Sequence, residues 1–130
     1  MRRLVHPLLL LLTLVSACTA APPPPKAAAL RAELMKEVGD AACDSDAQCR
    51  TVAVGHKACG GPAGYMAWSS KRSSEARLKD LARRQSEAEK AENEGNGMMS
   101  NCAVVVDPGA VCKAARCELR ADKPAGERAR

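Results

Sequence analysis

The chain has 130 residues and a net charge of +5, and it contains one Trp, one Tyr and no Phe. This length allows one compact domain, and the shortage of aromatic residues excludes a large aromatic core. Burial alone would stabilise such a domain poorly, so covalent cross-links are expected. Seven cysteines can supply them, but the odd number means that at least one cysteine forms no intramolecular disulfide.

The first 17 residues have the pattern of an export signal. Arg2 and Arg3 are followed by an apolar run from residue 4 to residue 15. This run is too short to span a bilayer as a helix, which takes about 20 apolar residues. A plain signal peptidase site near Ala17 or Ala21, with Cys18 removed, is one interpretation of the small residues that follow.

The Val15-Ser16-Ala17-Cys18 sequence resembles the lipobox of bacterial lipoproteins. In that family the cysteine is diacylated on its sulfur, the signal, here residues 1–17, is cut before it, and the new amino terminus is acylated. The resemblance implies that Cys18 carries lipid and holds the mature chain on a bilayer. Because Thr19 rather than Asp follows Cys18, the sorting rule of Gram-negative lipoproteins implies placement in the outer membrane, facing the periplasm.

Residues 18–26 include four consecutive prolines and are expected to form an extended spacer between the anchor and the body. Residues 27–39 predict a short helix, because Leu30, Leu34 and Val38 recur at helical spacing and Gly39 suits the position after its end. The charged residues around Pro124 predict a disordered tail over 121–130.

Residues 40–120 are expected to form a small α+β domain, with one long helix on a three-stranded sheet. Strands are predicted at 51–54, 102–106 and 111–119, with a turn at 107–110 that makes the last two a hairpin. The segment from Trp68 to about Glu94 predicts the helix, which Ser69 or Ser70 would cap and the glycines at 95 and 97 would end. Its thin apolar stripe consists of Leu78, Leu81, Ala82, Gln85 and Ala88.

The six cysteines of this domain predict three disulfides in an exported protein. If the long helix connects parallel strands, Cys59 and Cys112 fall at one end of the sheet and the other four cysteines at the opposite end. Among the possible pairings, this topology favours Cys59–Cys112, Cys49–Cys102 and Cys43–Cys117.

Residues for metal or catalytic chemistry are sparse. Among the cysteine intervals, only that between Cys112 and Cys117 suits a zinc site. His56 with Met98 and Met99 is a copper candidate, although a solvated loop histidine beside gap-filling methionines is the simpler interpretation. The sequence has no Gly-x-Ser-x-Gly or Cys-x-x-Cys motif, so we expect no enzyme, no bound metal and no cofactor. His56 would be the base of any catalytic site.

Four residues are candidate binding contacts. Tyr65 and Trp68 follow a Cys-Gly-Gly-Pro turn, and they either cover one end of the core or form a recognition edge. The predicted helix is basic in its first part, where Arg83 and Arg84 lie, and acidic in its second part. This pattern indicates either a solvated face or an electrostatic surface for a partner. Nucleic-acid binding is not expected of an exported chain with this small charge.

The segments Cys43-Asp-Ser-Asp-Ala-Gln-Cys49-Arg and Cys59-Gly-Gly-Pro resemble those of small cysteine-rich lipoproteins of proteobacteria. No activity comes with that resemblance. The sequence predicts a non-enzymatic structural or binding module, anchored to the lipid bilayer through acylated Cys18, with an envelope protein or glycan as its partner. The alternative is an inhibitor of a secreted hydrolase, such as a lysozyme or protease, that uses the loop from Gly55 to Gly64.

Overall fold

A computed structural model describes residues 25–121 of the chain. The expected signal peptide (1–17), the lipidation site Cys18, nearly all of the spacer and nearly all of the tail lie outside the described residues. None of the helices within 25–121 is long and apolar enough to cross a membrane. The elements in chain order are α1 (Lys26–Val38), the 3-10 helix η1 (Asp46–Gln48), β1 (Cys49–Val54), β2 (Gly64–Ser69), α2 (Glu75–Asn96), β3 (Ala110–Lys113) and β4 (Arg116–Leu119).

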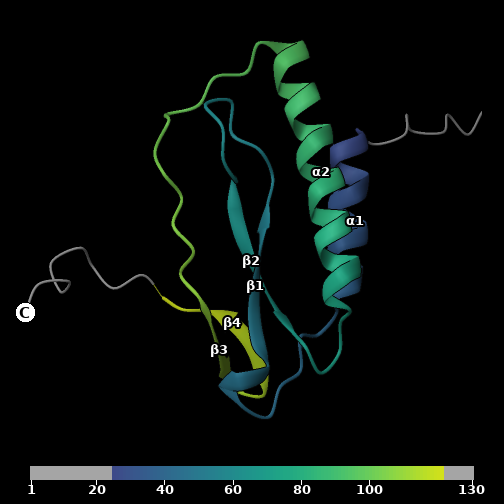
Figure 1. Cartoon of the computed structure of the whole chain (residues 1–130), viewed down its shortest axis with the longest axis vertical. Helices are drawn as coiled ribbons and strands as arrows, with labels where there is room; N and C mark the ends of the chain where they lie inside the picture. Colours follow the sequence, from purple (N-terminus) through teal and green to yellow (C-terminus); the bar gives the residue numbers. More distant parts are fainter. Residues whose placement is uncertain (1–24, 122–130) are drawn as a thin grey trace, which may run out of the picture.

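The fold is α+β, as predicted, and the β1–β2 hairpin is its central layer. Figure 1 shows α1 and α2 packed side by side on one side of this hairpin, with the extended segment 98–109 on the other side. The short β3–β4 hairpin lies at the end of the molecule away from the β1–β2 loop. The core therefore lies between the helices and the central hairpin.

Both predicted helices are present. In α1, Leu30, Leu34 and Val38 are buried, and Gly39 ends the helix with a φ of 58°. Leu34 of α1 and Leu78 of α2 have no exposed surface, and burying a leucine completely contributes about 1.5–3 kcal/mol. The buried residues of α2 are those of the predicted stripe: Leu78, Leu81, Ala82, Gln85 and Ala88.

The predicted start of α2 at Trp68 is wrong, because the helix begins at Glu75. Ser74 is its N-cap, and the Ser74 side chain accepts a hydrogen bond of 3.4 Å from the Arg77 N–H. Ser69 lies in β2, where its buried hydroxyl donates to the Ala42 carbonyl at 2.6 Å. The alternation of side chains in β2 buries Trp68 in the central hairpin, and this burial outweighs the helix propensity of its neighbours.

The predicted three-stranded sheet is also wrong, because the strands form two separate antiparallel hairpins, β1–β2 and β3–β4. The segment 102–106 forms no strand. The turn between β3 and β4 falls at Ala114 and Ala115, which have φ values of 48° and 60°, and not at 107–110. Two consecutive residues with positive φ match the twist of a tight hairpin. No parallel crossover therefore exists in the part of the chain that the structure describes.

The six cysteines form three disulfides, as predicted, but all three predicted pairs are wrong. The actual pairs are Cys43–Cys112, Cys49–Cys117 and Cys59–Cys102. The physical reason is the direction of the segment 98–109, which runs antiparallel to β1. Lys57 donates a hydrogen bond to Asn101, Thr51 donates one to Asp107, and Asp46 accepts one from the Cys112 N–H. This direction brings Cys102 to the loop end of the hairpin and Cys112 to the opposite end.

Candidate functional site

A groove of about 620 Å³ lies between β1 and α2. Four buried side chains line its apolar floor, and five charged or titratable side chains surround it. The floor residues are Val52, Trp68, Leu78 and Ala82, and the rim residues are Arg50, His56, Glu75, Lys79 and Arg83.

The register of the central hairpin places the floor residues together. Arg50 lies opposite Trp68 and Val52 lies opposite Met66, so these side chains share the face that α2 covers. Leu78 and Ala82 of α2 are four residues apart and therefore lie on one side of the helix. Trp68 is only 3% exposed, so it forms the bottom of the groove and does not project from the surface.

Most rim charges are already paired along α2. The Arg83 guanidinium lies 2.8 Å from both Asp80 and Glu87, and the hydrogen bonds that it donates, first to Asp80 and then to Glu87, raise its pKa. Lys79 lies 2.6 Å from Glu75, and their hydrogen bond lowers the pKa of the Glu75 carboxyl. These pairs are exposed and of the i,i+3 and i,i+4 kinds, so each contributes little to stability. These pairs do hold the charged side chains of Glu75, Lys79 and Arg83 in defined positions on the rim of the groove.

Arg50 differs from the other two rim cations. Its Nη1 atom donates hydrogen bonds to the carbonyls of Ala47 at 2.7 Å and Cys49 at 2.9 Å. It forms no ion pair with any carboxylate of residues 25–121. Its other guanidinium nitrogens make no hydrogen bond within the same residues. Arg50 is therefore the rim cation best placed to receive an anionic group.

Three polar side chains of α2 form hydrogen bonds with the backbone of the loop that borders the groove. Gln85 accepts a hydrogen bond of 2.7 Å from the Gly55 N–H, and Glu89 accepts one of 3.1 Å from the His56 N–H. Asn93 donates to the His56 carbonyl at 2.8 Å. Gly55 has a φ of 75°, and a Cβ there would lie 2.8 Å from Glu89 Oε2. Only glycine fits this close approach, so the position of the loop is fixed on α2.

The structure separates the four predicted binding residues. Tyr65 and Trp68 lie on opposite faces of β2, so they do not form one recognition edge. Trp68 and Arg83 line the groove, whereas Tyr65 and Arg84 do not. Arg84 lies 3.8 Å from Asp80 in an exposed ion pair. Arg50 was not among the predicted binding residues. However, Arg50, Val52 and Val54 alternate along a β-branched run, and this pattern indicates that the three side chains share one face of the strand.

The six cysteines within residues 25–121 have no sulfur available for a metal ion in the disulfide-bonded state. The Sγ atoms of Cys43, Cys49 and Cys117 lie within 4.8 Å of one another, a spacing that suits metal ligands. Each of these sulfurs is bonded in a disulfide, and a disulfide offers no thiolate.

The chain matches no protein-family model, no curated protein and no solved structure. The chemistry of the groove is therefore the basis for assigning a function.

Proposed function

We propose that this chain is an exported lipoprotein whose body is a non-enzymatic binding module, anchored to the membrane through acylated Cys18 and facing the periplasm from the outer membrane. Its binding site is the groove between β1 and α2. The observation that carries this proposal is the groove itself, a concave apolar surface with a few convergent polar groups, which is typical of binding sites. The three disulfides support an oxidising compartment.

The partner in this proposal is an envelope protein or a glycan. Arg50 offers a charged contact at one side of the groove, and Val52 and Ala82, which keep a small exposed fraction, offer apolar surface beneath it. A partner with an anionic group next to an apolar one would use both features.

The anchor is tested by metabolic labelling with palmitate in a Gram-negative host. The full chain is expected to incorporate label and to show the mass of three acyl chains, and a Cys18→Ser variant is expected to lose both. A Cys18→Ser protein that still carries lipid would contradict the assignment.

The groove is tested by photo-crosslinking in living cells. A photoreactive amino acid replaces Ser86, which lines the groove, and in a matched control it replaces Ala32, which is exposed on α1. The expected result is an adduct from position 86 that is absent from position 32. The same adducts from both positions, or none from either, would contradict a binding role for the groove.

One observation favours the alternative function, inhibition of a secreted hydrolase. The loop from Gly55 to Gly64 is held by α2 at its start and by Cys59–Cys102 near its tip, while Ala58, Gly60 and Gly61 are exposed. Such an exposed loop, fixed in one conformation, loses little entropy on binding an enzyme cleft.

The inhibitor function is tested with lysozymes and serine proteases at micromolar concentrations of the chain. An inhibitor is expected to lose potency in an Ala58→Arg variant and to keep it in Arg50→Gln, which leaves the loop from Gly55 to Gly64 unchanged. Unchanged rates for every enzyme tested would remove this alternative.

A further inference from the structure

The outer edge of β1 is open. The Ser70 N–H donates to the Gln48 carbonyl at 2.9 Å, in register with the β1–β2 pairing. Hydrogen-bonded pairs alternate along an antiparallel ladder, so residues 50, 52 and 54 bond to β2. The main-chain N–H and C=O groups of Thr51 and Ala53 therefore point away from β2. None of the hydrogen bonds within residues 25–121 uses these four groups.

The groove lies along this open edge. Thr51, Val52 and Ala53 belong to its lining, and Ala53 is exposed. A third strand beside β1 would hydrogen-bond to Thr51 and Ala53, and every second side chain of that strand would face the apolar floor. The geometry thus offers main-chain bonds and side-chain contacts to the same ligand.

The outer edge of β2 lacks this combination. Tyr65 and Ala67 also direct main-chain groups away from the hairpin, by the same alternation. Neither residue lines the groove. Only the β1 edge therefore joins open main-chain groups to an apolar floor.

The charges along the rim indicate what kind of strand fits. Among the lining residues there are three cations, Arg50, Lys79 and Arg83, and one carboxylate, Glu75. Lys79 and Arg83 already have carboxylate partners, whereas Arg50, in β1 itself, forms no ion pair within residues 25–121 and interacts only with the more distant charge of Glu75. A strand with an acidic side chain near Arg50 would supply the missing partner and form a charge-assisted hydrogen bond.

We propose that the groove binds an extended acidic segment of a partner protein as a third strand on β1. Main-chain bonds to Thr51 and Ala53 hold the segment, a carboxylate pairs with Arg50, and apolar side chains lie over Val52 and Ala82. This proposal rests on the binding function of the groove and specifies its partner as a polypeptide.

The test begins with a displayed library of random dodecapeptides selected on the full exported chain in detergent. Selected peptides are expected to contain an acidic residue flanked by β-branched residues. Arg50→Gln should weaken their binding by at least about tenfold, because a charge-assisted bond is lost. The matched control Arg31→Gln, at an exposed position on α1, should leave binding unchanged.

The main-chain bonds are tested on the peptide and on the protein separately. N-methylation of the alternate peptide residues that face β1 should abolish binding, while N-methylation of the intervening residues should not. On the protein, Ala53→Pro removes an edge N–H without removing a ladder bond, so it should weaken peptide binding with an unchanged melting temperature. The amides of Thr51 and Ala53 should exchange rapidly in the free chain and slowly with peptide bound.

Three results would overturn the proposal. The first is a library that yields no binders dependent on Arg50, and the second is an equal effect of the two methylation patterns. The third is amide exchange at Thr51 and Ala53 that is slow without peptide and slows further as the protein concentration rises, which would mean that a second copy of the chain pairs with the edge. An adduct from position 86 that contains a glycan and no polypeptide would leave the binding function intact and refute the added strand. The two proposals can therefore fail separately.

Discussion

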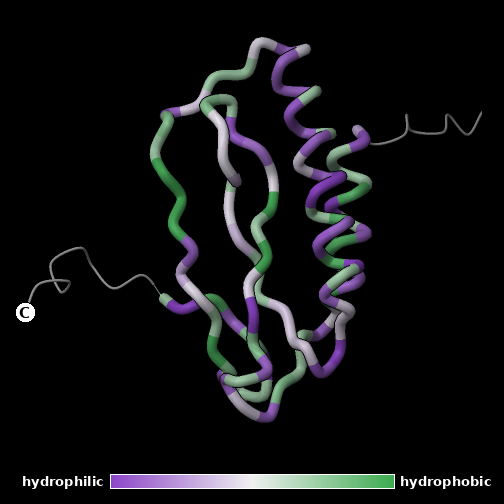
Figure 2. The backbone as a smooth tube through the Cα atoms, viewed as in Figure 1, coloured by the Kyte–Doolittle hydropathy of each residue, from purple (hydrophilic) through white to green (hydrophobic). Residues whose placement is uncertain are grey.

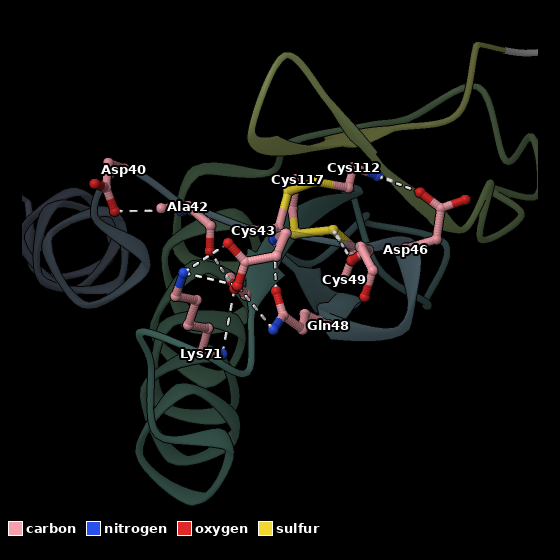
Figure 3. Close-up of a disulfide and its surroundings, with 12 residues drawn as sticks. Asp40, Ala42, Cys43, Asp46, Gln48, Cys49, Lys71, Cys112 and Cys117 are labelled. Carbon is pink, nitrogen blue, oxygen red and sulfur yellow. Dashed lines mark hydrogen bonds and ion pairs between the residues drawn. A yellow bond between two sulfur atoms is a disulfide. The ribbon is translucent and has the colours of Figure 1, made fainter.

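The two ends of the β1–β2 hairpin are held by different means. At the disulfide end, Cys43–Cys112 and Cys49–Cys117 join the hairpin and the preceding chain to β3 and β4, and Cys43, Cys49 and Cys117 are buried (Figure 3). At the loop end, Cys59–Cys102 is exposed, and polar side chains of α2 hold the backbone. The difference shows that a chain with few aromatic residues stabilises one end of the hairpin with buried disulfides. It stabilises the other end with hydrogen bonds to the α2 side chains Gln85 and Glu89, which we call the polar clamp.

The disulfide end also has main-chain links between distant segments. The Cys43 N–H donates to the Ala115 carbonyl at 3.0 Å, and the Cys117 N–H donates to the Ala41 carbonyl at 2.9 Å. These bonds place the chain after α1 beside β4. The two disulfides and these bonds act on the same small region, so we expect it to unfold as one unit.

The loop end is bordered by apolar chain that faces solvent. Figure 2 shows a hydrophobic stretch, in green, within the segment 98–109. Met99 is 90% exposed and Val104 is 88% exposed. Side chains this exposed contribute little burial energy, so the hydrogen bonds and Cys59–Cys102 must hold the loop end in place.

The largest effect should come from removing the buried Cys49–Cys117 disulfide. In a Cys49→Ala, Cys117→Ala variant, the remaining Cys43–Cys112 disulfide still closes nearly the same loop, so the unfolded chain regains only the freedom of the short loop between these two disulfides, and this costs about 3 kcal/mol. The variant also loses packing at two buried sulfurs. Urea unfolding of the full chain would measure the loss.

The matched control is a Cys59→Ala, Cys102→Ala variant. The intact Cys43–Cys112 disulfide also shortens the loop that Cys59–Cys102 closes, so the loop-entropy loss is again about 3–4 kcal/mol, but both residues are exposed and no buried packing is lost. The Cys49/Cys117 variant should therefore unfold at the lower urea concentration. The reverse order would show that the loop end contributes more to the folded state than the disulfide end does.

The second effect is a difference between the two ends in the rate at which their disulfides are reduced. Cys59 and Cys102 are exposed, while Cys49 and Cys117 are each 6% exposed. Thiol–disulfide exchange needs access for the attacking thiolate, so a mild dithiol should reduce Cys59–Cys102 at least about tenfold faster. Alkylation of the freed thiols and peptide mapping would follow both rates. Release of all six thiols at the same rate would show that the disulfides at the two ends of the hairpin are not reduced independently.

How far the sequence predicts this structure also differs between regions. The two helices follow from local patterns, and the stripe from Leu78 to Ala88 is buried as expected. The strand at Tyr65–Trp68 was missed because its neighbours are helix formers, and its strand conformation depends on pairing with β1. The turn at Ala114 and Ala115 has no glycine or asparagine to indicate it.

The disulfide pairing could not follow from the sequence, because it depends on the direction of a segment without regular structure. Predicting 102–106 as a strand parallel to β1 placed Cys102 at the wrong end. The groove was missed for a related reason. Arg50 and Lys79 are far apart in the sequence and become neighbours only through the packing of β1 on α2. Trp68 and Arg83 were found as separate residues, without the cavity that they share.

A third and smaller effect tests the polar clamp at the loop end. Gln85→Ala leaves the buried Gly55 N–H without a partner, and an unsatisfied buried group costs about 1–3 kcal/mol. The Glu89 carboxylate loses its hydrogen bond from Gln85 but keeps the one from the His56 N–H. Urea unfolding would measure this loss, and hydrogen exchange should become faster in the loop from residue 55 to residue 64. Ser86→Ala, one residue further along α2, is the control. An equal loss in both variants would mean that the clamp contributes nothing specific.

The smallest effect should come from an exposed ion pair at the disulfide end. Lys71 Nζ lies 2.9 Å from Asp44 Oδ1 and 2.8 Å from Oδ2. The hydrogen bond from Lys71, then that from Gln48, lowers the pKa of the Asp44 carboxyl below its ordinary value of 3.8. The exposure of both side chains allows solvent to screen the pair, so its contribution is below those of the disulfides and of Gln85.

The pH dependence of this pair has a definite sign. Because the pKa of Asp44 is lower in the folded state than in the unfolded chain, its stabilisation is fully present above pH 3.8 and is lost as the pH falls through the lowered value. The urea midpoint of the wild type should exceed that of Asp44→Asn near neutral pH, and the difference should shrink in acid below pH 3.8. Glu33→Gln, at an exposed position on α1, should not show this change. A wild-type advantage over Asp44→Asn that stays constant into acid would show that the ion pair adds nothing beyond the neutral hydrogen bonds at this end.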